Sequence, residues 1–172
     1  MEILIPGLIL VGLMVWVSTR IKRSAAKAFE REEIETAEFS LIKPEGLLAP
    51  VDPAAGTLFS AFSRDFGTNG AEHMRCATAE LTAVRNAQLS DVINEAMKDS
   101  ITKLSEQIGV IDGNRCANIV VERLVQDIPL ESHYKIIATR NQVYRLSVNV
   151  LTESKDEFQP KIDELLSSFS LS

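Results

Sequence analysis

Histidine and cysteine, the side chains that most often ligate metals or activate a nucleophile, are scarce in this sequence. The histidines are His73 and His133, and the cysteines are Cys76 and Cys116. His73 and Cys76 have the spacing H-x-x-C, which is half of a metal site if Cys116 or His133 lies close to them in the fold. The chain has no second paired motif that would supply the remaining ligands, so the sequence predicts no metal centre and no other cofactor.

The catalytic motifs that depend on spacing are also missing. Neither histidine lies in a nucleophile elbow or an H-E-x-x-H pattern, and the chain has no P-loop and no G-x-G-x-x-G. We therefore expect no catalytic residue, surface or edge-strand positions for both histidines, and a protein that is not an enzyme. An enzyme with an unrecognised site is an open alternative. Both cysteines fall in strand patterns, where free thiols are expected, although a single disulfide remains possible.

The charge of the chain argues against nucleic acid as a partner. The net charge is −6 and the isoelectric point is near 5, so the electrostatic field has the wrong sign for phosphate. Gly67 and Gly70 form a G-x-x-G pattern that also occurs in RNA-binding KH modules, but its acidic surroundings favour an ordinary turn. Five carboxylates lie between Glu30 and Glu38 and could bind a cation or a basic partner; a solvated helical stalk explains them equally well.

The N-terminus carries the clearest signal in the chain. Residues 3–19 are 17 consecutive residues without a charge, which is about 25 Å of helix against a hydrocarbon core of roughly 30 Å. Residues 1–23 are therefore predicted to be a single transmembrane helix with its basic flank. A buried core helix and a cleaved signal peptide are the alternatives, although the only charge before the apolar run is that of Glu2. The residues predicted to anchor the helix in lipid are Ile3, Leu8, Leu10, Leu13 and Trp16.

Basic residues follow the apolar run and set its predicted orientation. Arg20, Lys22, Arg23 and Lys27 lie within eight residues that contain no acid. The positive-inside rule then places the N-terminus outside and the rest of the chain in the cytoplasm. The same cations are predicted to contact anionic lipid headgroups, at about 1 kcal/mol each.

The remaining chain divides into a stalk and a domain. Residues 24–37 are predicted to be a charged helical stalk, and residues 38–172 a soluble domain. Residues 1–37 carry five basic and five acidic side chains, which leaves 13 basic and 19 acidic for residues 38–172. The net negative charge therefore belongs to the domain, which an anionic leaflet would repel.

The sequence of the first half of the domain predicts mostly strands. Residues 39–42 form a short strand that ends at the sequence Lys-Pro-Glu-Gly. Residues 58–66 have phenylalanines three and four apart, which suits either a helical face or a bulged strand. Residues 74–85 alternate as a strand. Its predicted core-facing residues are Ala77, Ala79, Leu81 and Ala83.

The second half contains two predicted helices around three strands. Apolar spacing predicts a helix over residues 89–108, with Ser90 as N-cap and Gly109 after its C-terminus. Strands follow at about 116–126, 133–139 and 143–151, the last two joined by a short hairpin turn. A closing helix is predicted from the capping box that begins at Ser154, with Pro160 offsetting its start to near Gln159. This order predicts an α+β domain, an antiparallel sheet with two packed helices.

The last elements resemble a known family. Residues 144–151, followed by Asp-Glu-Phe-Gln-Pro at 156–160 and Leu-Leu-Ser-Ser-Phe at 165–169, are similar to the PsbP-like superfamily over roughly residues 38–172. That superfamily includes photosystem extrinsic subunits, a Ran-binding nuclear import factor and many bacterial proteins. The resemblance implies a non-enzymatic binding or accessory role. It carries over no binding residue, and the predicted membrane helix departs from the soluble members.

Two functional hypotheses follow. The first is a single-pass membrane protein, of a kind that suits a bacterium, whose cytoplasmic α+β domain is tethered near a membrane partner that is another protein. Lipid is then a partner only of the N-terminal helix. The alternative is an exported, membrane-tethered domain of the cell envelope that binds a small ligand or metal.

Overall fold

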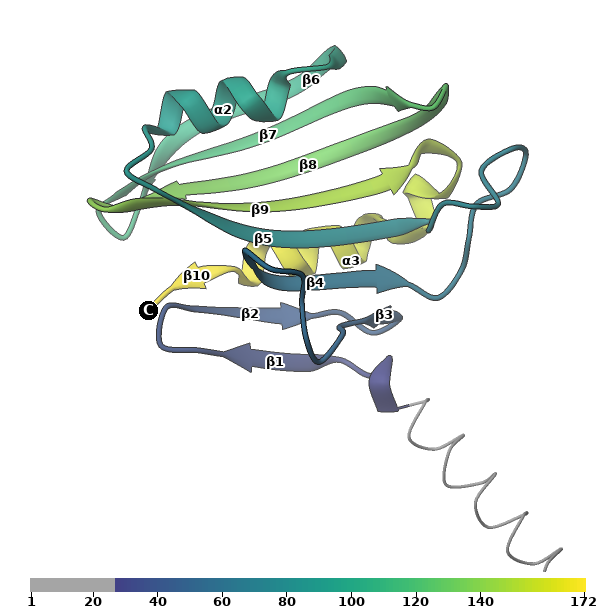
Figure 1. Cartoon of the computed structure of the whole chain (residues 1–172), viewed down its shortest axis with the longest axis horizontal. Helices are drawn as coiled ribbons and strands as arrows, with labels where there is room; N and C mark the ends of the chain where they lie inside the picture. The colour runs from purple at the N-terminus through teal and green to yellow at the C-terminus, as the bar shows by residue number, and fades with distance from the viewer. Residues whose placement is uncertain (1–26) are drawn as a thin grey trace, which may run out of the picture.

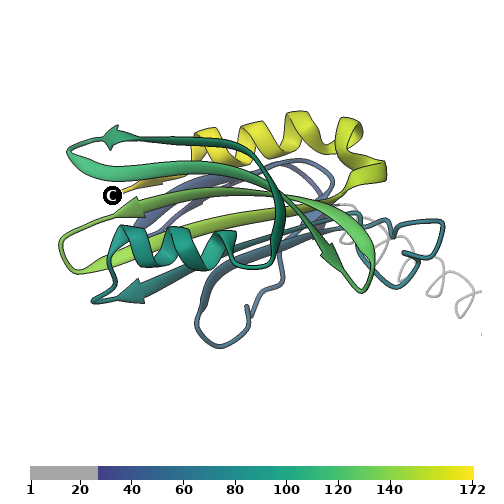
Figure 2. The ribbon, with the colours of Figure 1, turned by 90° about the horizontal axis from the view of Figure 1, so that it is seen from above.

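The computed structural model describes residues 27–172, which fold into an α+β unit (Figure 1). A long antiparallel sheet forms its middle layer, and one helix lies on each face of that sheet (Figure 2). Helix α2 spans Leu89–Met97, helix α3 spans Lys155–Ser168, and a 3-10 turn at Thr152–Ser154 precedes α3. The expected fold class is confirmed for this part of the chain.

The strands form two sheets. The large sheet has the order β3-β4-β5-β9-β8-β7-β6 and the small one the order β1-β2-β10, with every pair antiparallel. The strand bounds are β1 Glu32–Glu35, β2 Phe39–Lys43, β3 Leu47–Leu48, β4 Thr57–Ser63, β5 Ala77–Arg85, β6 Ser100–Ile111, β7 Asn114–Val125, β8 Ile128–Ala138, β9 Gln142–Leu151 and β10 Ser170–Leu171.

The two faces of the large sheet carry separate apolar cores. On one face α3 and β2 pack over β5 and β9, where the alternation of small and branched side chains gives a continuous apolar surface. Ala77, Ala79 and Leu81 are buried there, as the sequence predicts. On the other face α2 covers β7, β8 and the start of β9 only. No helix of residues 27–172 covers the rest of that second face.

Buried polar side chains on β8 fix the position of α3. Lys135 donates from Nζ to the main-chain oxygens of Leu166 and Phe169, which end the helix, at 2.8 and 2.7 Å. At the other end of the helix, the Glu131 carboxylate lies 2.6 Å from Nζ of Lys155. A cation at the C-terminus and a carboxylate at the N-terminus both complement the helix dipole. Burial lowers the pKa of Lys135, and the two carbonyl contacts offset part of this cost.

A second buried lysine ties the start of the described chain to the domain. Lys43 is 1% exposed, and its Nζ donates to the main-chain oxygens of Ala28, Glu30 and Leu47. The Glu32 carboxylate lies 3.6 Å from the same nitrogen. Because all three N–H groups of the ammonium have carbonyl partners, residues 28–30 are held against β2 and β3.

The predicted helical stalk is not helical over its last part. Glu32–Glu35 form β1, which pairs with β2, although residues 24–37 were expected to form a charged helix. The reason is tertiary: β2 offers a free edge, and Ile34 packs against the core while the glutamates around it stay in solvent. The folded unit therefore begins before residue 38.

The helix predicted over residues 89–108 is wrong beyond Met97. Asp99 adopts a positive φ of 63°, and Ser100–Ile111 is strand β6. Ile101 and Ile108, which fit the helical apolar spacing, are 62% and 59% exposed, so no core holds them on a helix face. Antiparallel pairing with β7 satisfies backbone N–H and C=O groups of this segment instead. Gly109 consequently lies inside a strand, and the N-cap residue of α2 is Gln88 instead of Ser90.

The other predicted elements can be scored individually. The strands predicted at 39–42, 74–85, 116–126, 133–139 and 143–151 are confirmed within a few residues, although β8 starts earlier, at Ile128. The undecided stretch 58–66 is the strand β4, with a register shift near its start. The closing helix is confirmed, but the Ser154 side chain makes no cap hydrogen bond. The helix starts at Lys155, with Pro160 inside it, so the predicted offset to Gln159 is wrong.

Replacing Lys43 with methionine should destabilise the domain. The change keeps the apolar stem but leaves three carbonyl oxygens without their charged donor, a loss of about 2–4 kcal/mol in the free energy of unfolding. Urea unfolding followed by circular dichroism measures it, with Lys98→Met, at an exposed position after α2, as the control. Equal free energies of unfolding for the two variants would contradict the proposed role of the Lys43 contacts.

Candidate binding site

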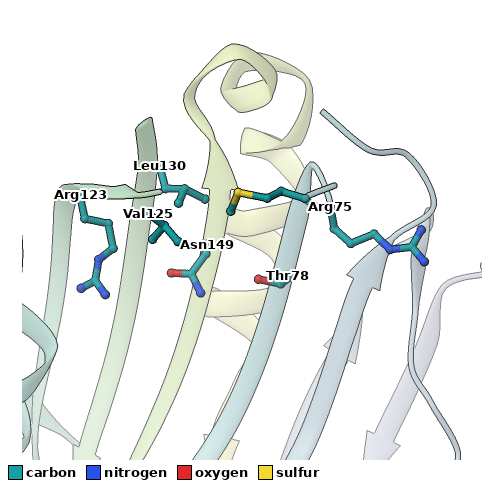
Figure 3. A pocket seen from close by; sticks show the side chains of 7 residues that line it. Arg75, Thr78, Arg123, Val125, Leu130 and Asn149 are labelled. Carbon is teal, nitrogen blue, oxygen red and sulfur yellow. The ribbon is translucent and has the colours of Figure 1, made fainter. Parts of the chain in front are cut away.

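A hollow of about 250 Å³ opens on the part of the sheet that α2 does not cover. It lies at the end of the sheet where β5 begins, where β9 ends and where β7 turns into β8. Figure 3 shows Thr78 and Asn149 between Arg123 on one side and Arg75 on the other. Its lining residues are Met74, Arg75, Thr78, Arg123, Val125, Leu130 and Asn149.

Strand alternation makes the floor of this hollow polar. Thr78 and Asn149 are cross-strand partners, and they point away from the core because their neighbours Ala79 and Val148 point into it. The next strand adds Ser132, whose Oγ donates to Oδ1 of Asn149 at 2.6 Å. This contact fixes the orientation of the amide, so that its Nδ2 hydrogens remain for a ligand.

Arg75 stands at one side in a fixed position. Its guanidinium stacks on Phe62 and Phe66, with ring centroids 4.8 and 4.0 Å away, and its Nη1 donates to the main-chain oxygen of Arg64 at 2.7 Å. Two aromatic faces and one carbonyl hold the cation, and its other N–H groups have no partner within residues 27–172. The guanidinium is therefore ordered before any ligand binds.

Arg123 stands at the other side and connects the hollow to α2. Its Nη2 donates to the main-chain oxygen of Ala96 at 2.7 Å, and its guanidinium lies 5.6 Å from the centre of the Tyr134 ring. The Nε of Arg123 is buried and has no hydrogen-bond partner among the described residues. A buried donor of this kind is costly, and a bound acceptor would relieve that cost.

The loop beside the hollow is held tightly. Glu153 accepts hydrogen bonds from the main-chain nitrogen of Thr68 at 2.6 Å and from its hydroxyl at 3.0 Å, and these bonds lower the pKa of the Glu153 carboxyl. A Cβ at Gly67 would collide with Cδ1 of Leu151 and would lie 2.7 Å from the Cβ of Ala71, so only glycine fits there. Gly67 also donates to the main-chain oxygen of Met74 at 2.9 Å, which positions the residue just before Arg75.

The lining of the hollow is suited to holding a ligand. Its lining residues include two arginines, an asparagine and a threonine beside apolar side chains, and no Asp, Glu, His or Cys. Figure 3 shows the side chain of Arg75 directed away from Thr78 and Asn149, so that its guanidinium lies at the outer side of the hollow. Neither arginine forms an ion pair within residues 27–172, although the chain has a net charge of −6. The arrangement suits a ligand that carries a carboxylate or another anionic acceptor next to an apolar group.

A further polar cluster lies under α3. Nε2 of His133 lies 2.8 Å from Oε1 of Glu131, off the line of a good hydrogen bond, and Lys155 contacts the other carboxylate oxygen. Burial lowers the pKa of His133 against the opposing effect of Glu131. Ser132, the nearest hydroxyl along the chain, faces the opposite side of the sheet and contacts Asn149. The pair thus has no adjacent nucleophile and serves the packing of α3.

His133 is therefore not where the sequence placed it. It was expected at the surface or on an edge strand, but it is 6% exposed on β8, which lies inside the large sheet. The reason is that β8 has helices on both faces, so even its polar positions are covered. His73 is exposed, as expected, with Nε2 2.9 Å from Oε1 of Gln126.

The H-x-x-C pattern is not brought together as a metal site. His73 faces solvent, whereas Cys76 is buried in the core under α3. Cys116 belongs to the same core, and both thiols are free. Within residues 27–172 no three metal-ligating side chains come together.

The comparisons with known proteins bear on the fold. No family model matches the chain, and no curated protein matches it in sequence. Among solved structures, CyanoP, the cyanobacterial PsbP of Synechocystis sp. PCC 6803, matches with a TM-score of 0.56 at 13% identity, over 83% of this chain and 92% of that one. The chain has a PsbP-like fold.

Two other solved structures share this architecture. The Ran-binding protein Mog1p of Saccharomyces cerevisiae matches with a TM-score of 0.55 at 12% identity, over 83% of this chain and 96% of that one. LpqN of Mycobacterium tuberculosis matches with a TM-score of 0.57 at 7% identity, over 83% and 91%. The expected likeness to the PsbP-like superfamily is thus confirmed for the fold.

The residues predicted to anchor the chain lie almost entirely outside the described part. Ile3, Leu8, Leu10, Leu13, Trp16, Arg20, Lys22 and Arg23 all precede residue 27. Lys27 is described and is exposed to solvent. From residue 27 onward, the chain forms no helix with the length and apolarity that a membrane span needs.

Few features of the sequence predict the hollow. Thr78 and Asn149 could be assigned to one face from strand alternation, once the pairing of β5 with β9 is known. Arg75 and Arg123 carry no such signal, because they are 48 positions apart and meet this site only through the sheet register. Their stacking partners, Phe62 on β4 and Tyr134 on β8, also reach them through the fold of the sheet.

His133 should make stability depend on pH. Because burial lowers its pKa below 6.5, the unfolded chain binds more protons at mildly acidic pH, and the free energy of unfolding falls as the pH drops below about 6.5. The titration of one such group changes the free energy of unfolding by at most about 1.4 kcal/mol per pH unit. Urea unfolding between pH 8 and 5 should show a shallower dependence for His133→Gln. The exposed control, His73→Gln, should keep the original dependence of the free energy of unfolding on pH. The same dependence in His133→Gln would show that His133 is not its source.

Proposed function

We propose that this chain is a non-enzymatic accessory module that binds another protein through the hollow between Arg75 and Arg123. The observation that carries the proposal is the composition of that site: ordered cations, an oriented amide and an apolar wall, with no Asp, Glu, His or Cys among its lining residues. The PsbP-like fold supports a binding role, since Mog1p is described as Ran-binding. The fold by itself does not specify the partner.

The ligand segment that fits this site is an acidic one. A carboxylate of the partner would face the guanidinium of Arg123, while an aliphatic side chain would lie against Leu130 and Val125. A second acidic group of the partner would meet Arg75 at the outer side of the hollow. Both arginines are already held by backbone carbonyls, so little side-chain entropy is lost when a partner binds.

Membrane tethering is part of the proposal. The uncharged run at residues 3–19 and its basic flank support a single membrane helix, with the N-terminus outside and the domain in the cytoplasm. The contacts of Lys43 to residues 28 and 30 support a short connection, because the chain is already bound to the domain there. A short tether would confine the binding site to a thin layer and raise its effective concentration near a membrane partner.

A second candidate is an exported domain of the cell envelope that is tethered to the membrane. It is favoured by the likeness to LpqN, which is described as involved in cell envelope biogenesis. Protease treatment of intact cells distinguishes the two candidates, since only an exported domain would be digested. Digestion would overturn the cytoplasmic orientation and leave the binding role of the hollow standing.

Crosslinking and recovery of the full-length chain from membranes tests the binding role. Arg75→Gln and Arg123→Gln should each reduce recovery of the partner about tenfold, because arginines ordered in a pocket tend to dominate binding energy. Arg140→Gln is the matched control, an exposed arginine in the turn between β8 and β9. Equal recovery with all three variants would contradict the proposed site.

A shortened chain that lacks residues 1–26 keeps every described element and separates anchoring from recognition. Recovery of the same partner with this chain would assign recognition to the domain. Recovery with the full-length chain alone would place recognition in the N-terminal segment and overturn the role of the hollow.

A further inference from the structure

Strand β6 ends the large sheet with a free edge. It is 12 residues long and pairs only with β7 within the described part of the chain. Figure 1 shows it as the outermost strand beside α2. The backbone N–H and C=O groups on an unpaired edge remain available to another strand, which natural proteins usually prevent by charges, bulges or a covering segment.

Two bulges interrupt the first half of this edge, and the second half is regular. The register with β7 shifts between Ser100 and Thr102 and again between Lys103 and Ser105. From residue 105 to residue 111 the pairing continues without a shift up to the turn. The regular segment, residues 105–111, therefore has Ile108 at its centre.

The turn fixes which backbone groups of this segment point outward. Asp112 and Gly113 both have positive φ, 50° and 79°, as in the two-residue type I′ turn of a hairpin. The pair that closes such a turn, here Ile111 and Asn114, is hydrogen-bonded, and bonded pairs then alternate along the strands. The N–H and C=O groups of residues 106, 108 and 110 therefore point away from β7.

Side chains on the same segment are apolar and exposed. Ile108 and Val110 are 59% and 67% exposed. Ile108 lies on the α2 side of the sheet, because its partner on β7 is Ala117, which is buried under α2. Exposed branched side chains beside outward-pointing backbone groups are the features of a strand that pairs with another strand.

We propose that β6 pairs with β6 of a second copy of this chain, antiparallel and centred on Ile108. In this register Ile108 lies opposite Ile108 of the second copy, and Val110 lies opposite Glu106. Residues 105 and 111 pair at the two ends, so the whole regular segment of each copy is used. This β6–β6 pairing, the seam between the two copies, joins two seven-stranded sheets into one continuous sheet.

The charges near the seam are complementary in this arrangement. Arg115 is the β7 partner of Val110, so it lies one strand behind the position that faces Glu106 of the second copy. The two-fold axis brings an Arg115 near a Glu106 of the other copy at two places, where Glu106 also lies 2.7 Å from Nζ of Lys103 in its own chain. Because two chains of net charge −6 repel each other, a second copy is expected to dock only where local charges match, as they do here.

A cysteine at the centre of the seam tests the register. In a hydrogen-bonded antiparallel pair the Cα atoms are about 5.5 Å apart, which a disulfide can bridge. Full-length Ile108→Cys, mildly oxidised in detergent, should form a disulfide-linked dimer on a non-reducing gel. The control is Val51→Cys, since Val51 is 96% exposed and lies far from β6 in sequence and outside the sheet. The native thiols are both buried and do not compete.

Ile108→Cys should crosslink at least about tenfold faster than Val51→Cys, because the pairing raises the local concentration of the two thiols. Equal rates, or no dimer with Ile108→Cys, would overturn the proposal. A charge exchange in the Ile108→Cys background adds a second test: Glu106→Arg should slow crosslinking, and adding Arg115→Glu should restore it. Failure of the double variant to restore the rate, with an unchanged circular dichroism spectrum, would rule out this register.

Discussion

The packing of α3 depends on the buried charges of β8. Lys135 neutralises the C-terminal carbonyls of the helix, and Glu131 lies with Lys155 at its N-terminus, so both ends of the helix dipole meet an opposite charge below them. These contacts set the axial position of α3, which an apolar interface alone would leave free to slide. β10 follows α3 directly and pairs with β2. The position of α3 therefore also determines where the small sheet lies.

One consequence is that the two faces of the large sheet have different roles. The face under α3 and β2 is closed and apolar, whereas α2 covers only part of the other face. The uncovered part carries the alternate, polar positions of β5 and β9, among them Thr78 and Asn149. A binding site there does not disturb the packing of the core, because its side chains project from strands whose opposite faces are already packed.

The PsbP-like fold is shared with proteins of less than 15% identity to this chain, so architecture and recognition must be considered separately. The features proposed here to bind partners are local ones. The arginines of the hollow are held by aromatic rings and carbonyls, and the free segment of β6 is defined by two bulges and a turn. None of these features is required by the sheet order, and each can change while the fold stays the same.

The sequence alone determined the fold class and most of the strands, because alternation on strands such as β9 reflects one buried face and one wet face. It also excluded the nucleotide motifs. It failed at β6 and β1, where apolar or charged spacing suited a helix and only pairing with β7 and β2 chose a strand. The burial of His133 and the placement of Arg75 and Arg123 on either side of one hollow were likewise decided by tertiary structure. Both depend on strand order, and residues that become neighbours through a sheet have no fixed spacing in the chain.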